Sequence, residues 1–492
     1  MRLLLAGILA ASVLSATAVS DTADAAEQRD GAKVRKLVAQ RARINDPQAD
    51  GTTALHWAAH WNDLQSFTLL LSAGANPKAV NRYGATPLSE AAAVGNAAMI
   101  EALLKAGADP NTLTTADGET VLMTAARAGQ VEAVQSLLSH GANVNAREQF
   151  RGQTALMWAA AERHPQVVKL LLARGADWKA LSFDRNNVIP KLSAASSITP
   201  MSKGGLTALD FAAREGDVES ARYMLDAGAD INQLDADSTH ALTIALMNKH
   251  YTFAKVLLER GANPNLADSR GRTPLYAAID ARDEDYSAMP SRKEDDPLSS
   301  LEIIQALLDH GANPNATLIR NLPGRSGMDS GDTALGAGTT TLMRAARAGD
   351  AEVMRMLLKK GADPKRQTET GNDALLFAAG VGYRDKNTHG DEAGALEVVK
   401  LALAQGLDLH RSNTRGETAL HGAAYRGADS IVEYLVAQGA RLDEKTKSGL
   451  TVLDYAMGKS ITTQLPVPHE STVTLIHKLG GREGREIVAA NQ

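Results

Sequence analysis

The chain has 492 residues, a formal net charge of −5 and a pI near 6.2. A charge this close to neutral does not favour a nucleic-acid partner, and the length exceeds what one globular core supports. The chain has no cysteine, which excludes disulfides, thiolate metal sites and a lipid-modified cysteine.

The N-terminus has the pattern of a secretory signal peptide. Met1 and Arg2 give a short basic start, Leu3 to Leu14 is apolar, and Ala16-Thr17-Ala18 supplies the small residues of a cleavage site. A membrane anchor is the alternative, although the apolar run is short for a bilayer span. We therefore expect residues 1–18 to be a cleaved signal peptide and the protein to be periplasmic or secreted, with no membrane span in the mature chain.

Residues 19–50 are predicted to be a linker followed by one capping helix. This helix is expected from Gly31 to Ile44, because Val34, Leu37 and Val38 fall on one face at helical spacing. A polar outer surface on such a helix suits the end of a repeat array.

A repeated motif begins at Gly51 and governs most of the chain. The sequence Gly-Thr-Thr-Ala-Leu-His-Trp-Ala-Ala at 51–59 returns in related form at 84–92, 152–160 and 416–424. The Thr position marks each repeat, and most steps are 33 or 34 residues; the marks are Thr53, Thr86, Thr120, Thr154, Thr207, His240, Thr273, Thr340, Asp373, Thr418 and Thr451. Thr followed by Ala or Pro is typical of a helix start, since its hydroxyl can cap free backbone N–H groups.

The second half of each repeat predicts a second helix. A mid-repeat Gly, as at Gly129, favours a left-handed turn that ends the first helix. Val131, Val134 and Leu137 then recur at helical spacing, and Gly-Ala-Asn or Gly-Ala-Asp closes the helix before a polar loop.

A period of 33 residues with these helix starts resembles the ankyrin-repeat family, in particular its exported bacterial members. The resemblance implies an all-α ankyrin-repeat solenoid of about eleven helix-turn-helix units with hairpin-like loops and terminal caps. It covers about 51–480 and implies a protein-binding role. His240 and Asp373 replace Thr, and Lys249 stands where a mid-repeat Gly is expected; these departures are expected to weaken their repeats.

Longer steps between marks locate the insertions, and loops of such length are uncommon unless functional or disordered. The acidic segment 283–300 predicts a solvated loop, whereas the segment 178–203, with Trp178, Leu181 and Phe183, could dock on the solenoid or on a partner. The predicted organisation is repeats 1–4 at 51–177, an insertion at 178–203, repeats 5–7 at 204–315 (with the insertion near 283–300), an insertion at 316–337, repeats 8–11 at 338–480 (insertions near 383–394 and 460–472), and a tail at 481–492.

Sequence motifs for catalysis, metal binding or phosphate binding are weak. His56 and His60 lie four residues apart, but they lack the glutamate of a metallohydrolase and a third ligand, so His56 and its counterpart His421 are interpreted as framework residues. The glycine-rich stretches 324–327 and 380–382 lack the lysine of a phosphate loop and are interpreted as flexible connections. We predict no catalytic residue, no metal and no cofactor.

The residues after each Ala-Ala pair and those at the loop tips vary between repeats, and the family resemblance places them on a concave groove and its rim. Aromatic and arginine side chains are frequent anchors of protein interfaces. The predicted protein-binding residues are His60, Trp61, Arg82, Tyr83, Arg127, Gln149, Phe150, Glu162, Arg214, Glu215, Ser269, Arg270, Arg347, Asn413, Thr414, Tyr425 and Arg426.

The favoured function is therefore a monomeric, non-enzymatic scaffold that binds a protein partner. One alternative is an inhibitor, immunity or protective partner of a single exported enzyme. A more remote one is an enzyme whose site is built from the insertions. A residue at any one groove or tip position could also be ordinary solvated surface.

Overall fold

The computed structural model describes residues 20–115, 117–184, 204–283, 296–322, 334–383, 391–459 and 468–484. Within them, twenty-four α-helices form twelve consecutive pairs. No strand occurs in the described ranges, only isolated bridges such as Leu113 with Thr120. None of the helices in these ranges has the length and apolar character needed to cross a membrane.

The chain divides into two compact bodies, 1–180 and 181–492. The N-terminal body contains the first five pairs: α1 Asp21–Glu27, α2 Gly31–Ala39, α3 Ala54–His60, α4 Leu64–Ser72, α5 Pro87–Ala93, α6 Ala97–Lys105, α7 Val121–Arg127, α8 Val131–Ser139, α9 Ala155–Ala161 and α10 Pro165–Ala173.

The C-terminal body contains the other seven pairs: α11 Ala208–Glu215, α12 Val218–Asp226, α13 Ala241–Met247, α14 Tyr251–Glu259, α15 Pro274–Arg282, α16 Ser300–Asp309, α17 Thr341–Ala348, α18 Ala351–Lys359, α19 Ala374–Ala379, α20 Glu392–Ala404, α21 Ala419–Arg426, α22 Asp429–Ala437, α23 Val452–Ala456 and α24 Glu470–Lys478.

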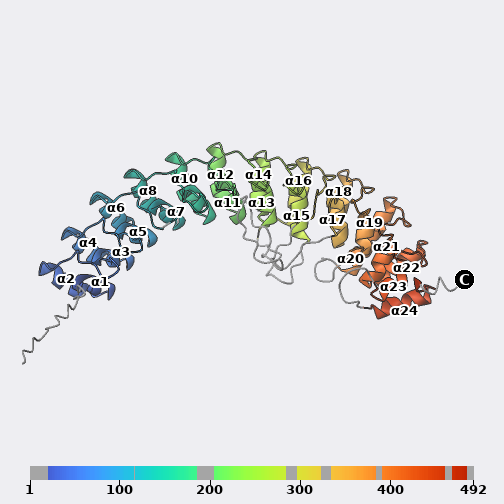
Figure 1. Cartoon of the computed structure of the whole chain (residues 1–492). Helices are drawn as coiled ribbons and strands as arrows, with labels where there is room; N and C mark the ends of the chain where they lie inside the picture. Colours follow the sequence, from blue (N-terminus) through green and yellow to red (C-terminus); the bar gives the residue numbers. More distant parts are fainter. Residues whose placement is uncertain are drawn as a thin grey trace, which may run out of the picture. The chain divides into compact units, whose positions relative to one another are not determined.

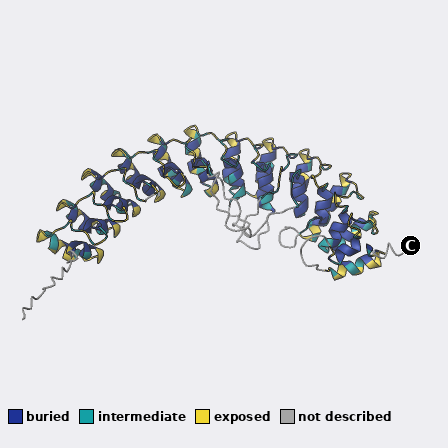
Figure 2. Ribbon diagram, viewed as in Figure 1, coloured by how far each residue is buried: buried dark blue, intermediate teal, exposed yellow. Residues whose placement is uncertain are grey.

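Within each body the helices form two layers (Figure 1). The first helix of each pair packs against the first helices of its neighbours, and the second helices do the same in the other layer. Figure 2 shows that first helices are buried along most of their length, while exposed residues gather on the second helices and at the loops. Ala59, Ala92, Ala126 and Ala160 are fully buried, so the Ala-Ala pair allows the close helix approach that a solenoid requires.

The Thr mark caps the first helix as predicted. The Thr86 backbone is extended, and its Oγ1 accepts a hydrogen bond from the Ser89 N–H at 3.1 Å. Asp373 keeps this function, because its carboxylate accepts from the Leu376 N–H at 3.0 Å. His240 makes no capping bond with its side chain. The expected weakening therefore applies to the helix start at His240 and not to the one at Asp373.

The first helix ends in a left-handed residue. Gly216 has φ 72° at this position, and Lys249, which replaces the glycine in the next repeat, has φ 61°. The turn is thus preserved at Lys249 with a conformation that a residue with a Cβ adopts at some cost. Replacing the glycine strains the repeat without removing its turn.

Asparagine side chains join the second halves of neighbouring repeats. Asn145 donates through Nδ2 to the Gly175 carbonyl at 3.1 Å, and its Oδ1 accepts from the Asp177 N–H at 2.8 Å. Asn265 makes the same two bonds further along the chain, to Gly311 and Asn313. The closing Gly-Ala-Asn or Gly-Ala-Asp motif of one repeat thus receives, through its backbone, the asparagine that stands two residues after the same motif in the repeat before it.

The N-terminal region differs from the prediction of one helix over 31–44. The structure has the pair α1 and α2, and α2 ends at Ala39 because Arg41 is left-handed, with φ 53°. The described residues therefore hold one helix pair more than the eleven predicted repeats.

Parts of the predicted insertions lie outside the described residues: 185–203, 284–295, 323–333, 384–390 and 460–467, together with the tail from 485. Asp283, predicted to begin a solvated loop, is buried at 3% exposure. The helices α20 and α24 begin at Glu392 and Glu470, inside segments predicted to be inserted. Leu181 and Phe183 are 36% and 43% exposed.

Candidate binding surface

The histidine of the repeat motif is a framework residue. His56 Nδ1 lies 2.8 Å from Thr53 Oγ1, and Nε2 lies 3.1 Å from the Ala85 carbonyl oxygen of the next repeat. Burial lowers the pKa of His56, so the neutral ring is favoured. His421 is likewise 2.9 Å from Thr418 Oγ1. No group of three His, Cys, Asp or Glu side chains suited to a metal occurs among the described residues.

The aromatic position of the motif has two environments. Phe211, Phe377 and Tyr455, each four residues after its repeat mark, are buried in the C-terminal body. In the N-terminal body, Trp57 and Trp158 are only partly buried. The helices α3 and α9 therefore leave part of an indole side chain accessible.

A cluster of rings and charges lies at the ends of α1 and α3. The Arg29 guanidinium lies over the Trp61 ring, 3.8 Å from its centroid, and the Trp57 ring stacks with Trp61 at a centroid distance of 6.0 Å and an interplanar angle of 15°. Trp61 Nε1 donates to the Glu27 carbonyl at 3.1 Å. His60 is 4.6 Å from the Trp61 ring, edge to face. These contacts hold a partly exposed indole in one orientation.

Neighbouring repeats extend this surface. His60 Nδ1 is 2.8 Å from Glu90 Oε2 on α5, and Arg127 on α7 forms an ion pair with Glu119 at 3.2 Å. The Arg127 guanidinium lies 5.2 Å from the Trp158 ring of the following repeat. Glu162 at the end of α9 is exposed. We call His60, Trp61, Arg127 and Glu162 the inner surface of the N-terminal body.

Loop tips in the N-terminal body combine a fixed backbone with exposed side chains. The Arg82 N–H donates to the Asp50 carbonyl at 2.7 Å, and the Gln149 N–H donates to that of Asp117 at 2.6 Å. Each tip is thus hydrogen-bonded to the preceding one. Tyr83 is 75% exposed and Phe150 56% exposed.

In the C-terminal body most of the predicted protein-binding residues are less exposed to solvent than those in the N-terminal body. Arg214 and Thr414 are exposed, while Glu215, Ser269, Arg270, Tyr425 and Arg426 are half-buried. Arg270 donates through an η-nitrogen to the Asn321 carbonyl at 2.6 Å. The Arg426 guanidinium lies 4.7 Å from the Tyr383 ring, and burial lowers its pKa.

The prediction that Arg347 has an exposed side chain is wrong. Arg347 is only 2% exposed, and its guanidinium donates to the carbonyls of Val381 at 3.2 Å and Gly382 at 2.7 Å. The glycine-rich stretch 380–382, interpreted from the sequence as a flexible connection, supplies these two carbonyls. Nearby, Leu335 packs against Met343 and Phe377, so part of the inner side of these repeats is filled by the chain itself.

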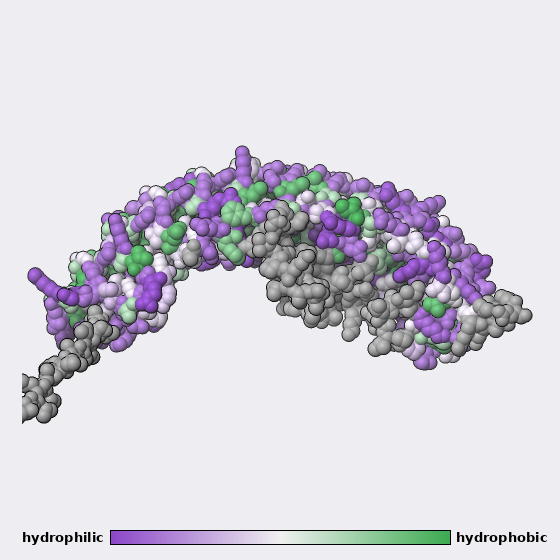
Figure 3. All heavy atoms as spheres, viewed as in Figure 1, coloured by the Kyte–Doolittle hydropathy of each residue, from purple (hydrophilic) through white to green (hydrophobic). Residues whose placement is uncertain are grey.

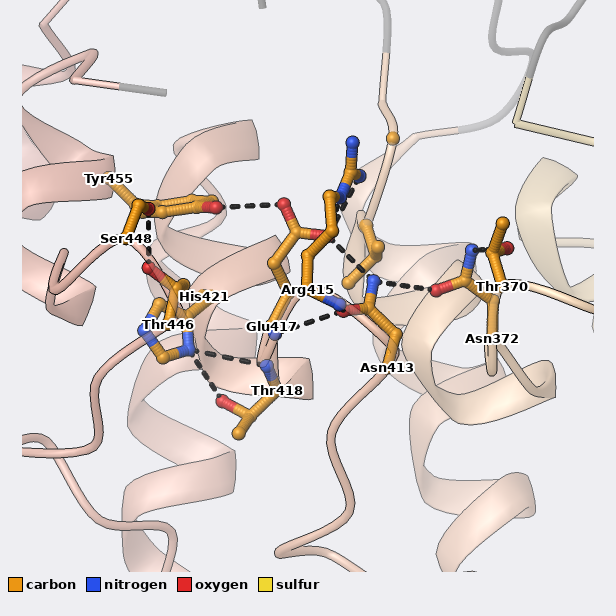
Figure 4. A network of polar contacts seen from close by, with 12 residues as sticks. Thr370, Asn372, Asn413, Arg415, Glu417, Thr418, His421, Thr446, Ser448 and Tyr455 are labelled. Atoms are coloured by element: carbon orange, nitrogen blue, oxygen red, sulfur yellow. Dashed lines mark hydrogen bonds and ion pairs between the residues drawn. The ribbon is translucent and has the colours of Figure 1, made fainter. Parts of the chain in front are cut away.

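Asn413 is also buried, at 5% exposure, within a polar network that links three loop tips (Figure 4). Its Nδ2 donates to Asn372 Oδ1 at 2.9 Å and to Glu417 Oε2 at 2.6 Å. Tyr455 donates its hydroxyl proton to Glu417 Oε1 at 2.8 Å. The pKa of Tyr455 is raised by burial and by Glu417, which keeps the phenol protonated. The network therefore stabilises the contact between neighbouring repeats.

A second network, of buried ion pairs, was not predicted from the sequence. Arg344 donates through Nε to Asp280 at 2.7 Å and lies 3.7 Å from the Asp283 carboxylate. Next to it, Arg282 pairs with Asp350 at 2.7 Å. Burial would lower the pKa of Arg344, but Asp280 and Asp283 raise it, whereas burial raises that of Asp283 well above its usual value. The sequence held one indication of this network, because Arg344 stands at the motif position that Trp57 and Trp158 occupy in their repeats.

Stacked helix pairs with a repeating framework and varied side chains along one side define the class of repeat solenoids that present extended binding surfaces. Family models agree. A model described as "Ankyrin repeats (3 copies)" matches residues 23–114, 108–182 and 209–318, "Ankyrin repeats (many copies)" matches 401–456, and "Ankyrin repeat" matches 337–369. The chain belongs to the ankyrin-repeat family, whose repeats are generally protein–protein interaction modules.

Curated relatives share only parts of the chain. Rabankyrin-5 of Homo sapiens is 27% identical over 283 residues, which are 53% of this chain and 21% of that protein. A putative ankyrin repeat-containing protein of Treponema pallidum is 33% identical over 124 residues, 25% of this chain and 36% of that protein. The chain therefore spans well under half the length of these relatives. The human ASB11 ankyrin repeat domain, a solved structure, is 26% identical with a TM-score of 0.40, covering 50% of this chain and 99% of that one.

Proposed function

We propose that the protein is a non-enzymatic binding protein that holds a partner protein on the inner surface of the N-terminal body and on the adjoining tips at Tyr83 and Phe150. The observation that carries this proposal is the contrast within single helices. In α3, Ala58 and Ala59 are buried framework residues, whereas His60 is exposed. In α7, Ala126 is buried and Arg127 is exposed.

The chemistry of the exposed side chains supports a protein partner. Trp61 offers a large amphipathic ring that is already immobilised, so little side-chain entropy is lost when a partner covers it. Arg127 and Glu162 add opposite charges on neighbouring repeats, which favour a defined orientation of the partner. The equivalent face of the eighth repeat is less suited, because Arg347 is buried.

Affinity capture tests this proposal. The bait is the purified chain, offered to the extracellular and periplasmic fractions of its own organism. A variant with Tyr83, Arg127 and Glu162 changed to Ala is compared with a control in which exposed Leu64, Lys105 and Gln135 on second helices are changed to Ala. We expect a protein that both the parent and the control retain and the inner-surface variant loses. Equal retention by all three would contradict the assignment of this surface.

The number of captured partners separates two roles. Several partners would support a scaffold, whereas one stoichiometric enzyme partner would support the inhibitor or protective role. Catalytic activity in the purified chain without any partner would contradict both.

We propose in addition that the protein is exported. The support is the basic start, the apolar run from Leu3 to Leu14 and the small residues before Val19. The test is N-terminal sequencing of the protein recovered from fractionated cells. An N-terminus at or near Val19 in an exported fraction is expected, and an intact Met1 in the cytoplasmic fraction would refute export.

A further inference from the structure

The second helix of the first pair, α2, and the residues that flank it carry a concentration of positive charge, whereas α1 carries Asp21, Asp24 and Glu27. Residues 29–43 contain six basic residues and one acidic residue in a chain of net charge −5. The basic residues are Arg29, Lys33, Arg35, Lys36, Arg41 and Arg43. The single acid, Asp30, is engaged as the N-cap of α2, where it accepts from the Lys33 N–H at 2.9 Å.

Three of these cations project from the end of the N-terminal body. Arg35 is directed to the next repeat, because its guanidinium donates to Gln65 at 3.2 Å. Lys33 and Lys36 are one helical turn apart on the other side of α2, and Arg41 follows the helix. All three are exposed, and no acidic side chain of the described residues forms an ion pair with them. We call Lys33, Lys36 and Arg41 the basic end.

At the end of the N-terminal body where Figure 1 labels α2, Figure 3 shows hydrophilic atoms with some hydrophobic atoms between them. Leu37 and Val38 remain half-buried on the same helix. A basic helix with a partly accessible apolar side is typical of segments that rest on membrane surfaces.

A solubilising cap alone would not require one sign of charge, since mixed charges keep a surface soluble. The last helix pair provides the comparison within this chain. In and after α24, Glu470 and Glu483 accompany Lys478 and Arg482, so that end carries both signs. The excess of positive charge in α2 and its flanking residues therefore has no counterpart in α24 and the residues that follow it.

We propose that the basic end docks on an anionic phospholipid surface and so places the N-terminal body beside a membrane. Lysine ammonium groups on flexible stems act as point charges and need no fixed acceptor geometry. Mobile lipid headgroups satisfy that requirement, whereas an acidic protein would have to present carboxylates at matching positions. Clusters of Lys and Arg on an amphipathic helix bind anionic lipid in this way, and residues 29–43, which include the basic end, hold six of them.

Vesicle co-sedimentation tests the proposal with the full chain. One set of vesicles is phosphatidylcholine alone, and the other contains about one third phosphatidylglycerol. The neutral set also reports any binding through the apolar run at Leu3–Leu14, if it is retained. The variant K33Q/K36Q/R41Q is compared with K105Q/R174Q/K359Q, which removes the same charge from second-helix ends elsewhere. Circular dichroism verifies that both variants fold.

We expect the parent and the control to sediment with anionic vesicles and not with neutral ones. The K33Q/K36Q/R41Q variant should partition about a hundredfold less, and the parent should be released at about 0.5 M NaCl. Equal partitioning by parent and K33Q/K36Q/R41Q would overturn the proposal. So would binding to immobilised polyglutamate without binding to anionic vesicles, which would indicate an acidic protein partner. Because these residues lie outside the inner surface, failure here leaves the partner-capture result unaffected.

Discussion

Arg344 on α17 and Asp280 on α15 form an ion pair that joins two neighbouring repeats, with Nε and Oδ1 2.7 Å apart. Arg344 is only 8% exposed, and its η-nitrogen also donates to the Asp283 carbonyl at 3.0 Å. One guanidinium thus holds the end of a first helix in the preceding repeat.

Replacing Arg344 with Met should destabilise the C-terminal body by about 3–5 kcal/mol, because the substitution leaves carboxylates buried without their cation. Urea denaturation at neutral pH measures the loss. Adding Asp280→Asn to Arg344→Met should recover part of it by removing one uncompensated charge. Arg355→Met is the matched control, since Arg355 and Glu397 form an ion pair that is half exposed and should contribute less than about 1 kcal/mol. Similar losses for Arg344→Met and Arg355→Met would show that the buried pair has no special weight.

Asp210 should make stability fall as the pH rises towards neutrality. Burial raises the pKa of Asp210 to about 7, although its carboxylate accepts from the Thr207 N–H. The folded state then retains a proton that the unfolded state releases above pH 4, so the contribution is full at low pH and is lost between about pH 4 and 7. The shift corresponds to at most about 4 kcal/mol. Asp210→Asn should flatten this part of the stability curve measured by urea denaturation.

Asp454 stands at the same motif position as Asp210, but its pKa is shifted in the opposite direction. Burial acts to raise its pKa, but hydrogen bonds from the Thr451 and Gly484 backbone, together with Lys459, hold it below the usual value. Its contribution should be present above pH 4 and be lost only as the pH falls further. Asp454→Asn should therefore cost stability at pH 7. If Asp210→Asn and Asp454→Asn had the same pH dependence, the assigned environments would be wrong.

His240 should make the sixth repeat sensitive to acid. Burial lowers the pKa of His240 to about 4, so the folded state resists a proton that the unfolded chain accepts near pH 6.5. Stability from the neutral ring is present above pH 6.5 and is lost as the pH falls towards 4. His240→Thr should add about 1 kcal/mol at pH 7 by restoring the helix cap, and more at pH 5. Unfolding midpoints at both pH values test this, and an equal change at the two would contradict the titration argument.

Much of the repeat could be read from the sequence because its framework positions obey local rules. Thr86 caps a helix through its own hydroxyl, and Gly216 ends one through its backbone, so neither depends on distant residues. Asp373 could be expected to cap for the same reason, since its short carboxylate reaches the same N–H group as a threonine hydroxyl. The weakening predicted there gave too much weight to residue identity.

The predictions that were wrong concern residues whose burial depends on a neighbouring repeat. Arg347 has the register of an inner-surface residue, yet α19 of the next repeat is short, and Gly380, with φ 118°, turns the chain so that the Val381 and Gly382 carbonyls receive the guanidinium. Asn413 has a tip register, but Asn372 and Glu417 enclose it. Neither arrangement follows from periodicity, because periodicity specifies a position in one repeat and not the contacts between two.

Lys78 interrupts the asparagine ladder of the N-terminal body and offers a test by gain of stability. It occupies the position that Asn111 and Asn145 have in the following repeats, and its side chain lies against Gly107. An asparagine there could donate to the Gly107 carbonyl and accept from the Asp109 N–H, as Asn145 does with Gly175 and Asp177. Two such partly exposed hydrogen bonds should contribute about 1–2 kcal/mol.

Lys78→Asn should therefore raise the urea midpoint of the N-terminal body, and Asn145→Ala should lower it by a similar amount. Lys78→Ala separates the gain of hydrogen bonds from the mere loss of a lysine. If Lys78→Asn and Lys78→Ala shift the midpoint equally, the ladder contributes nothing at this position. A gain only with asparagine would show that the Gly-Ala-Asn pattern couples neighbouring repeats through the side chain of the repeat before it.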